Sequence, residues 1–516
     1  MQLTSKIVTV AMLLSTVTRG YLAGIKNSLD IDVISQAKDV YFNEIVKLIN
    51  NIQIPDIYIN DDSYLLDNRF VLEETPDDVQ FYTDLENNAV VFEVTDFRGQ
   101  FYCDHFRYKE LIFIAKGDIE VDLKKIQITA GIGFGVTKLD DGRDVPMINP
   151  ADIKMDIDRR DIDIHIHGNI WTDLASLFEV FFKGTVIDMI EDTAETALNV
   201  GIPLIGNGLM TRLDGYFPIP GIPNWVADWE TPQAAVITDT KFAIGCKGLM
   251  FDREIGEEEP SIAIPDMPYY DASRPEKYQA YVSAYAIDGF FNSLIEVVGI
   301  HAWVNATEVP AAIPFKLTTD TVEILLPGIT KTYGSGQPVD VHFNVTSLGN
   351  FQVSEANEEM SGTFSMVLDF WVETTDGSVA QAASLGLNNA DFQFTALVNN
   401  MDIALDIDKV NVDSVDVLAS TIGRLSALTI KLEINNGFRL GLPIINKVLS
   451  KHQIPIPSNI LGLFILSDLT LGYHDDYIYA GATPTFIGPS AKTSAEVPHT
   501  EPLEITLIKH MLEIEQ

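Results

Sequence analysis

Residues 153–167, Ile-Lys-Met-Asp-Ile-Asp-Arg-Arg-Asp-Ile-Asp-Ile-His-Ile-His, alternate apolar with charged or polar side chains in two runs. Successive side chains of a strand point to opposite faces, so such a run places its isoleucines on one face and its charges on the other. This is typical of an antiparallel sheet with one solvated face. A period of two prevails from Tyr58 to His167 and returns at Val339–Val345 and Asp391–Phe394. The sequence therefore predicts a chain rich in one-sided antiparallel sheet.

Other stretches show the spacing of amphipathic helices instead. We predict helices over Asp32–Asn51, Thr172–Leu198 and Tyr285–Val298, and a late helical region over about Val415–Leu428 and Leu442–Leu449. The apolar stripe of the second of these helices is wider than packing on a single surface requires. Each half of the chain therefore runs helix, strands, helix and final strands, which predicts a structural duplication.

The length of 516 residues is too great for one core and favours two domains. Between the two repeats, Glu257-Glu-Glu-Pro260 is followed by Pro265, Pro268 and Pro275, which is the composition of a linker. We therefore divide the chain into a signal peptide, a first domain, a linker, a second domain and a tail. Their predicted bounds are 1–20, 21–251, 252–277, 278–482 and 483–516.

The charge and the N-terminus bear on location and partners. The net charge is −40, with 19 Lys and Arg against 39 Asp and Glu in residues 21–250 and 13 against 35 in 251–516. A surface this acidic repels nucleic acids and anionic membranes. Lys6 followed by the apolar run Ile7–Val17 is typical of a cleaved signal peptide, and Asn305 and Asn344 each begin a glycosylation sequon. We expect a glycoprotein that is secreted or held in the lumen of the secretory pathway.

The chemistry-bearing motifs are few. We find no Gly-x-Ser-x-Gly, His-Glu-x-x-His or P-loop sequence, and Gly131-Ile-Gly-Phe-Gly135 is better explained as a bent strand than as a nucleotide loop. His165 and His167 share one strand face, which a metal site would need, but a polar outer face explains them better. Cys103 and Cys246 allow either one disulfide or two free thiols. We predict no enzyme and no metal site.

Four stretches carry a resemblance to a known family. Leu48–Pro55 ends in Ile-Pro, Ala286–Asn292 reads Ala-Ile-Asp-Gly-Phe-Phe-Asn, Phe315–Thr319 follows, and Leu442–Leu449 leads into Ile454-Pro-Ile-Pro457. In these residues the chain resembles the lipid-binding family of bactericidal/permeability-increasing protein, lipopolysaccharide-binding protein, and the phospholipid and cholesteryl ester transfer proteins. The resemblance spans about residues 25–482 and is weaker between 58 and 250.

The resemblance implies a fold and a function. The fold would be α+β and boomerang-shaped, with two pseudo-symmetric barrels, each a long helix wrapped by a curved antiparallel sheet, joined by a central sheet. A phospholipid or other amphipathic lipid would occupy an apolar pocket of each barrel as the bound ligand, with no other cofactor and with transient contact to a membrane or lipoprotein surface. Ordinary core packing is the alternative for the apolar helix faces. The expected lipid contacts are Val40, Tyr41, Phe178, Phe181, Phe182, Phe290, Phe291 and Leu294.

The sequence departs from the family in two respects. Residues 145–200, where the family usually has a disulfide, contain no cysteine. Residues 21–250 carry a net negative charge, whereas bactericidal members grip anionic lipopolysaccharide with a lysine-rich first domain. The alternative function, a secreted defence or interaction protein that recognises microbial surface lipids, is therefore weakened in its anionic-ligand form.

Overall fold

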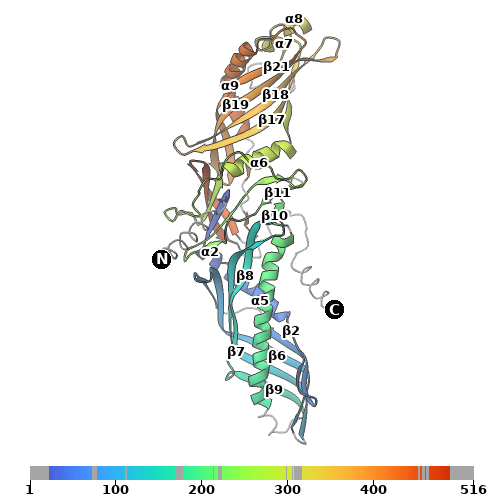
Figure 1. Cartoon of the computed structure of the whole chain (residues 1–516), viewed down its shortest axis with the longest axis vertical. Coiled ribbons are helices and arrows are strands. Elements are labelled where there is room, and N and C mark those ends of the chain that lie inside the picture. The colour runs from blue at the N-terminus through green and yellow to red at the C-terminus, as the bar shows by residue number, and fades with distance from the viewer. Residues whose placement is uncertain are drawn as a thin grey trace, which may run out of the picture.

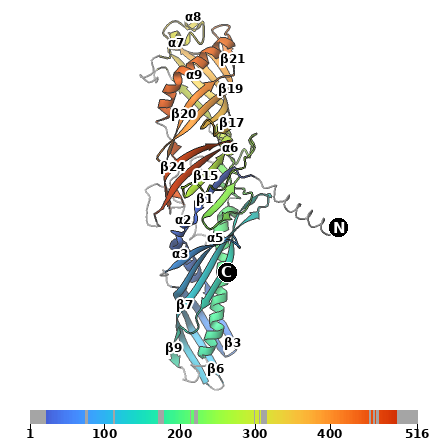
Figure 2. The same ribbon diagram turned by 90° about the vertical axis from the view of Figure 1, so that its left-hand side faces the viewer.

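The computed structural model describes residues 22–72, 78–110, 113–169, 178–212, 214–218, 224–297, 299–304, 306, 316–450, 454–455, 459–460 and 464–487. The predicted signal peptide, Asn305 and residues 488–516 of the predicted tail lie outside this part. The described chain is elongated, with a curled sheet and a long helix at each end and a smaller sheet between them (Figures 1 and 2). This is the predicted α+β boomerang.

The first barrel is a curled antiparallel sheet in the order β2-β4-β6-β7-β8, with β3 on β4, β5 on β6 and β9 on β7. Its longest strands, β6 and β7, are 22 and 26 residues long, and register shifts interrupt their pairing. Such bulges increase the local twist and help a sheet to curl. The bounds are β2 Gln53–Ile54, β3 Ile57–Asn60, β4 Ser63–Leu72, β5 Val79–Asp84, β6 Ala89–Glu110, β7 Phe113–Lys138, β8 Asp144–Ile157 and β9 Ile162–Asn169.

Two helical segments pack on this sheet. The first predicted helix is divided at residues 36–37 into α2 (Ile31–Ser35) and α3 (Lys38–Asn50). The second contains a π-helical turn, η1 (Phe182–Val186), which leads into α5 (Ile187–Arg212). It therefore ends at Arg212, beyond its predicted end at Leu198. Its predicted start at Thr172 lies outside the described residues.

The second barrel repeats this plan in the order β16-β17-β18-β19-β20-β22, with β21 on β19. The prediction of a helical region over Val415–Leu428 was wrong up to residue 426, because residues 414–420 form β21 and residues 421–426 are not helical. Val415 is buried there and Val417 packs against the same core, as alternation on a strand requires. The bounds are β16 Ile300–Val304, β17 Val339–Ser354, β18 Glu359–Glu373, β19 Val379–Asn399, β20 Asp402–Asn411, β21 Ser414–Ser420 and β22 Ile454–Pro455.

The helices of the second half have different positions. The long helix against this sheet is α9 (Ala427–Leu449), whereas α6 (Ala284–Val297) lies at the base of the barrel, and the short helices α7 (Thr319–Val322) and α8 (Ile329–Tyr333) lie at its tip (Figure 1). Within the described ranges, no helix combines the length and apolar character that crossing a bilayer requires.

The central sheet shows the duplication directly. Its order is β12-β13-β1-β15-β25-β24-β23, so three strands of the first half lie on one side and four strands of the second half on the other. β1 opens the first half and pairs with β13 near that half's end, and β15 opens the second half and pairs with β25 near its end. β1 and β15 pair with each other in the middle. The bounds are β1 Ile25–Asp30, β12 Val236–Ile237, β13 Lys241–Cys246, β15 Tyr278–Ser283, β23 Asn459–Ile460, β24 Phe464–His474 and β25 Tyr477–Phe486.

The long helix of each half is fastened to one strand by an asparagine. The Ile148 amide of β8 donates to Asn207 Oδ1 at 2.6 Å, and Asn207 Nδ2 donates to the Ile148 carbonyl at 2.7 Å. Asn446 of α9 makes the same pair of bonds with Ile407 of β20, both at 2.9 Å. Unpaired N–H and C=O groups at a sheet edge need partners. These amide side chains provide them and close each curled sheet with its helix.

Candidate functional site

The second barrel has a packed core at its tip and another at its base. The core at the tip includes Val339, Phe370 and Val372, which are at most 4% exposed. The core at the base, beside α6 and the central sheet, includes Phe351 and Met360, which are 2% and 5% exposed. The inward side chains between these two cores therefore decide whether the barrel is filled along its length.

The inner face of β18 is incompletely covered between the two cores. Val372 and Phe370 are buried, Leu368, Met366 and Phe364 are only half-buried, and burial then returns at Met360. β17 follows the same course, because Val339 is fully buried, the next inward residues are half-buried, and Phe351 is buried again. The half-buried inward residues of β17 that face those of β18 are Val341, Phe343 and Val345.

Burial decreases in the same way along helix α9. Residues four apart lie on one face of a helix, and the face of α9 toward the sheet carries Ile430, Ile434, Phe438 and Leu442. Ile430 and Ile434 are 1% and 8% exposed, whereas Phe438 and Leu442 are half-buried. Two neighbouring strands and the helix thus leave apolar surface partly uncovered. We call this surface the apolar band: Val341, Phe343, Val345, Phe364, Met366, Leu368 and Phe438.

The first barrel is filled more completely, and its apolar side chains become half-buried toward the central sheet. Along the inner face of β7, Ile126, Ile128 and Ala130 are fully buried, whereas Ile132 and Phe134 are half-buried. The Phe134 ring lies 4.9 Å from the ring of Phe242 in the central-sheet strand β13. The mouth of the first barrel against the central sheet is therefore a second, smaller partly covered apolar surface.

The predicted contacts Val40 and Tyr41 lie on α3, near this mouth. Both are half-buried. The Tyr41 ring lies 6.3 Å from that of Phe92, and Tyr41 also packs with Phe464 and Phe486 of the central sheet. Burial raises the pKa of the Tyr41 hydroxyl. The structure thus places these two residues where the first barrel meets the central sheet.

The predicted contacts Phe178, Phe181 and Phe182 lie together at the opposite end of the first barrel, where the long helix begins beside β9 (Figure 1). Phe178 and Phe182 are 1% and 0% exposed, and their rings each lie 5.4 Å from a phenylalanine of β6, Phe106 and Phe101 respectively. Phe181 is half-buried. The protein itself covers Phe178 and Phe182, so they are placed as packing residues.

The predicted contacts on α6 point in different directions. Phe290 lies 5.2 Å from the ring of Trp225 in β11 (Trp225–Asp228), whose indole N–H donates to Ser293 of α6. Phe291 stacks on Phe351 of the base core, with ring centres 4.8 Å apart. The side chain of Leu294 lies outside the described ones. The helix thus contributes Phe291 to the floor beneath the apolar band and Phe290 to the joint between the halves.

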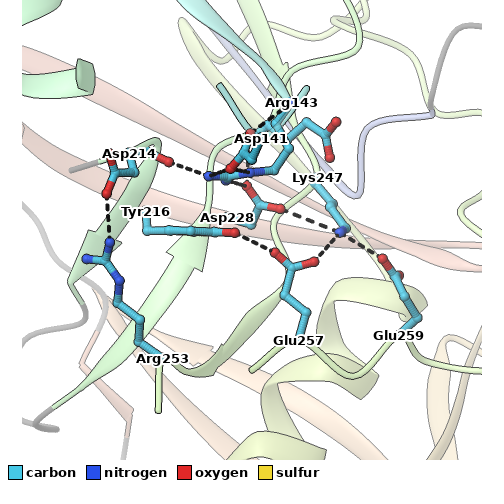
Figure 3. Close-up of polar contacts among 10 residues, drawn as sticks. Asp141, Arg143, Asp214, Tyr216, Asp228, Lys247, Arg253, Glu257 and Glu259 are labelled. Carbon is cyan, nitrogen blue, oxygen red and sulfur yellow. Dashed lines mark hydrogen bonds and ion pairs between the residues drawn. The ribbon is translucent and has the colours of Figure 1, made fainter. Parts of the chain in front are cut away.

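A polar cluster holds the connecting segment in place at that joint (Figure 3). Arg143 Nη1 lies 3.1 Å from Asp228 Oδ1. Lys247 Nζ lies 3.5 Å from Asp228 Oδ2, 2.9 Å from Glu257 and 2.7 Å from Glu259. Both glutamates belong to residues 253–277, which have no regular element. The segment predicted as a linker is thus tied to the first half by ion pairs.

The charges of this cluster compensate one another. Burial raises the pKa of the fully buried Asp228 despite its two cationic neighbours. Burial also opposes the charge on Glu259, but hydrogen bonds from Lys247 and from Tyr285 of α6 outweigh it and lower its pKa. Because Tyr285 belongs to the second half, the cluster fastens the connecting segment to both halves. We interpret it as structural.

The two cysteines and the asparagine of the described sequon lie on three different strands. Cys103 of β6 and Cys246 of β13 are buried free thiols, and burial raises their pKa values to about 11 and about 12. Of the two possibilities the sequence allowed, the structure therefore has free thiols. Asn344 is half-buried on β17, opposite Val367 and on the face away from the apolar band.

This arrangement defines a class of protein: two curled sheets, each closed by a long helix, joined end to end by a shared central sheet. The chain also matches the sequence model of the LBP / BPI / CETP family, C-terminal domain, over residues 224–485. That match covers just over half of the chain, and the chain belongs to this family. It is a lipid-binding protein of this type, and the family comprises lipid-binding and lipid-transfer proteins rather than enzymes.

Solved structures and curated sequences add little to this assignment. Lipopolysaccharide binding protein is 16% identical, with a TM-score of 0.44, over 90% of this chain and 100% of that one. Takeout 1 of Epiphyas postvittana is 13% identical (TM-score 0.21; 36% and 86%), and P47 of Clostridium botulinum E1 is 10% identical (0.23; 90% and 99%). A search of curated protein sequences gives no significant match.

The apolar band was not predicted from the sequence, although the sequence contains a signal for it. Val341-His-Phe343-Asn-Val345 and Phe364-Ser-Met366-Val-Leu368 both place three large apolar residues on one strand face. Their register across β17 and β18 brings these two faces side by side. Such runs are also typical of a filled core, so the run alone does not show how far the barrel is filled.

Proposed function

We propose that this chain is a secreted carrier that holds phospholipid-like molecules by their acyl chains, chiefly against the apolar band of the second barrel. The observation that carries the proposal is the fall in burial beyond the tip core on β17, β18 and α9, while Leu385 and Leu387 of β19 stay fully buried beside it. Apolar side chains that line the interior of a barrel and stay half-exposed favour an apolar ligand.

The energetics favour an acyl chain as that ligand. Transfer of a CH₂ group out of water contributes about 0.8 kcal/mol, so two long acyl chains represent on the order of 20 kcal/mol. Association and ordering offset a large part of this gain. The band supplies branched, aromatic and thioether side chains and no charge, so it suits the tails rather than the headgroup. A carrier of this kind needs no catalytic group, and we propose that the chain is not an enzyme.

The proposal is tested by introducing one charge on each face of β18. Met366 lies in the apolar band, and its neighbour Val367 points to the opposite face, where it pairs with Asn344. We expect Met366→Asp to lose lipid from the second barrel, because an unpaired charge against acyl chains is costly. Val367→Asp is the matched control and should keep its lipid. Native mass spectrometry with lipid extraction measures the occupancy of both variants.

Thermal melting of the same variants separates lipid loss from unfolding. Since Met366 is half-buried, its aspartate variant should stay folded without lipid, with its new charge solvated in the empty band. A Met366→Asp protein that unfolds would show that the band is ordinary core. Wild-type protein that is natively folded, yields no lipid on extraction and takes up none from phosphatidylcholine vesicles would refute the carrier proposal.

A further inference from the structure

The outer face of the second sheet carries a hollow of about 240 Å³ that the apolar band does not explain. It spans four strands near the base of the barrel. Its lining residues are Asn350 and Gln352 of β17, Ser361, Gly362 and Thr363 of β18, Asp391, Phe392 and Gln393 of β19, and Lys409 of β20.

The strand register separates this hollow from the lipid side of the sheet. Gln352, Ser361, Gln393 and Lys409 are successive cross-strand partners, so they form one row on one face. The alternate residues, such as Met360, pack into the base core on the other face. Phe392 also lines the hollow, although its ring packs on that other face, 5.9 Å from the ring of Phe364 in the apolar band. A ligand bound to the polar row would therefore lie on the opposite face of the sheet from a lipid held inside the barrel.

The polar groups of the hollow are largely free. The Asn350 side chain donates to the Thr363 hydroxyl at 2.8 Å, and that hydroxyl donates to the Gly349 carbonyl at 3.3 Å. The side chains of Gln352, Ser361, Asp391 and Gln393 make no hydrogen bond to any described residue. Ser361 and Gln393 are nevertheless half-buried. The amide and hydroxyl groups of these side chains can each donate and accept a hydrogen bond.

We propose that this hollow binds one ring of a neutral saccharide. Its amide and hydroxyl side chains match a ligand made of hydroxyl groups, which also donate and accept. Asp391 and Lys409 contribute one charge of each sign, so the site favours neither an anion such as phosphate nor a cation. The volume lies below the roughly 300–1,000 Å³ of drug-sized pockets, which suits a single sugar ring whose further units extend into solvent.

Two sources could present such a ring: a free or protein-linked glycan, or the headgroup of a glycolipid. The first arm of the test uses methyl glycosides of glucose, galactose, mannose and N-acetylglucosamine, with saturation-transfer NMR on the full chain. The second arm uses phosphatidylcholine vesicles with and without glucosylceramide. We expect a dissociation constant in the millimolar range, of about 1 mM, for at least one glycoside. Binding to glucosylceramide vesicles alone would assign the site to glycolipid headgroups.

Two glutamines make the matched comparison. Gln393→Ala removes a free amide from the hollow and should weaken sugar binding about fivefold, the effect of one lost hydrogen bond. Gln80→Ala removes an exposed amide from β5 of the first sheet and should leave binding unchanged. Met366→Asp should also leave sugar binding unchanged, so this inference and the proposed lipid function fail separately. No binding of any glycoside or glycolipid vesicle, or equal binding by Gln393→Ala and wild type, would overturn the assignment.

Discussion

The fastening of α9 to the sheet edge leads to a quantitative prediction for Asn446. Its side-chain amide satisfies both backbone groups of Ile407, with two bonds of 2.9 Å. Asn446→Ala removes both partners at once. The amide and carbonyl of Ile407 then depend on whatever water can enter between the helix and β20.

The expected loss follows from those two bonds. A hydrogen bond contributes about 0.5–1.5 kcal/mol net, and a buried group left without a partner costs about 1–3 kcal/mol. Ile407 and Asn446 are half-buried, so water replaces part of the loss. Alanine is also a better helix former than asparagine by up to about 0.7 kcal/mol. We therefore expect Asn446→Ala to lower the free energy of unfolding of the second barrel by about 1–2.5 kcal/mol.

Two further variants isolate the cause. Asn436 lies on the same helix, is exposed and makes no side-chain hydrogen bond to any described residue, so Asn436→Ala reports helix propensity alone. Asn446→Asp keeps the oxygen that accepts from the Ile407 amide and loses the donor to its carbonyl. Urea unfolding gives the free energies, and hydrogen exchange follows the Ile407 amide. That amide should stay protected in Asn446→Asp and lose protection in Asn446→Ala.

One result would refute this reasoning. If Asn446→Ala and Asn436→Ala have the same free energy of unfolding, and the Ile407 amide exchanges at the wild-type rate in both, the asparagine does not close the barrel. The helix would then be held by its apolar face and by Asn435, whose side chain makes the same pair of bonds with Val412.

The remaining predictions concern thiols, backbone and glycan. Cys103 and Cys246 should take up no iodoacetamide at pH 8 in the native protein, because burial raises the pKa of both thiols. In denaturant without reductant the protein should take up two labels, which mass spectrometry counts. A denatured protein that takes up no label would indicate a disulfide. Gly131→Ala should destabilise the first barrel by at least about 1–3 kcal/mol in urea unfolding, since a Cβ there would lie 1.8 Å from a carbonyl oxygen of β8, and wild-type stability would refute the clash. Protein secreted from eukaryotic cells should lose mass at Asn344 on treatment with an N-glycosidase, and an unmodified Asn344 would contradict the expected glycosylation.

Much of the fold could be predicted because a local period decides it. The period of two identified the long strands of both sheets, and the period of 3.6 identified the helices that begin the halves. The prediction failed where the two periods compete over a short stretch. Val415 and Val417 fit a strand, but with Leu418 they also fit one helical turn, and only the pairing of β21 with β19 decides between them. The local sequence pattern does not show which strand β21 pairs with.

The candidate site could be predicted less well, because it depends on burial at a distance. An apolar residue that fills a core and one that lines an unfilled interior look alike in sequence. Phe182 and Phe438 both lie on long helices, yet the ring of Phe182 meets Phe101 across a filled barrel and Phe438 remains half-buried. The difference depends on which side chains the sheet places opposite each ring, and residues remote in the sequence determine that together.

The two halves therefore share a plan without sharing how completely they are filled. In the first barrel the inward face of α5 is buried over the stretch from Ile187, 0% exposed, to Ile202, 7% exposed. Among the described side chains of α9 in the second barrel, Ile434 is the last buried one, and the half-buried Phe438 follows it. One barrel is filled and the other is partly open, so the two barrels need not hold the same amount of lipid. If the carrier proposal is correct, the second barrel should hold lipid along its middle, and the first only at the mouth against the central sheet, where Tyr41 and Phe134 lie.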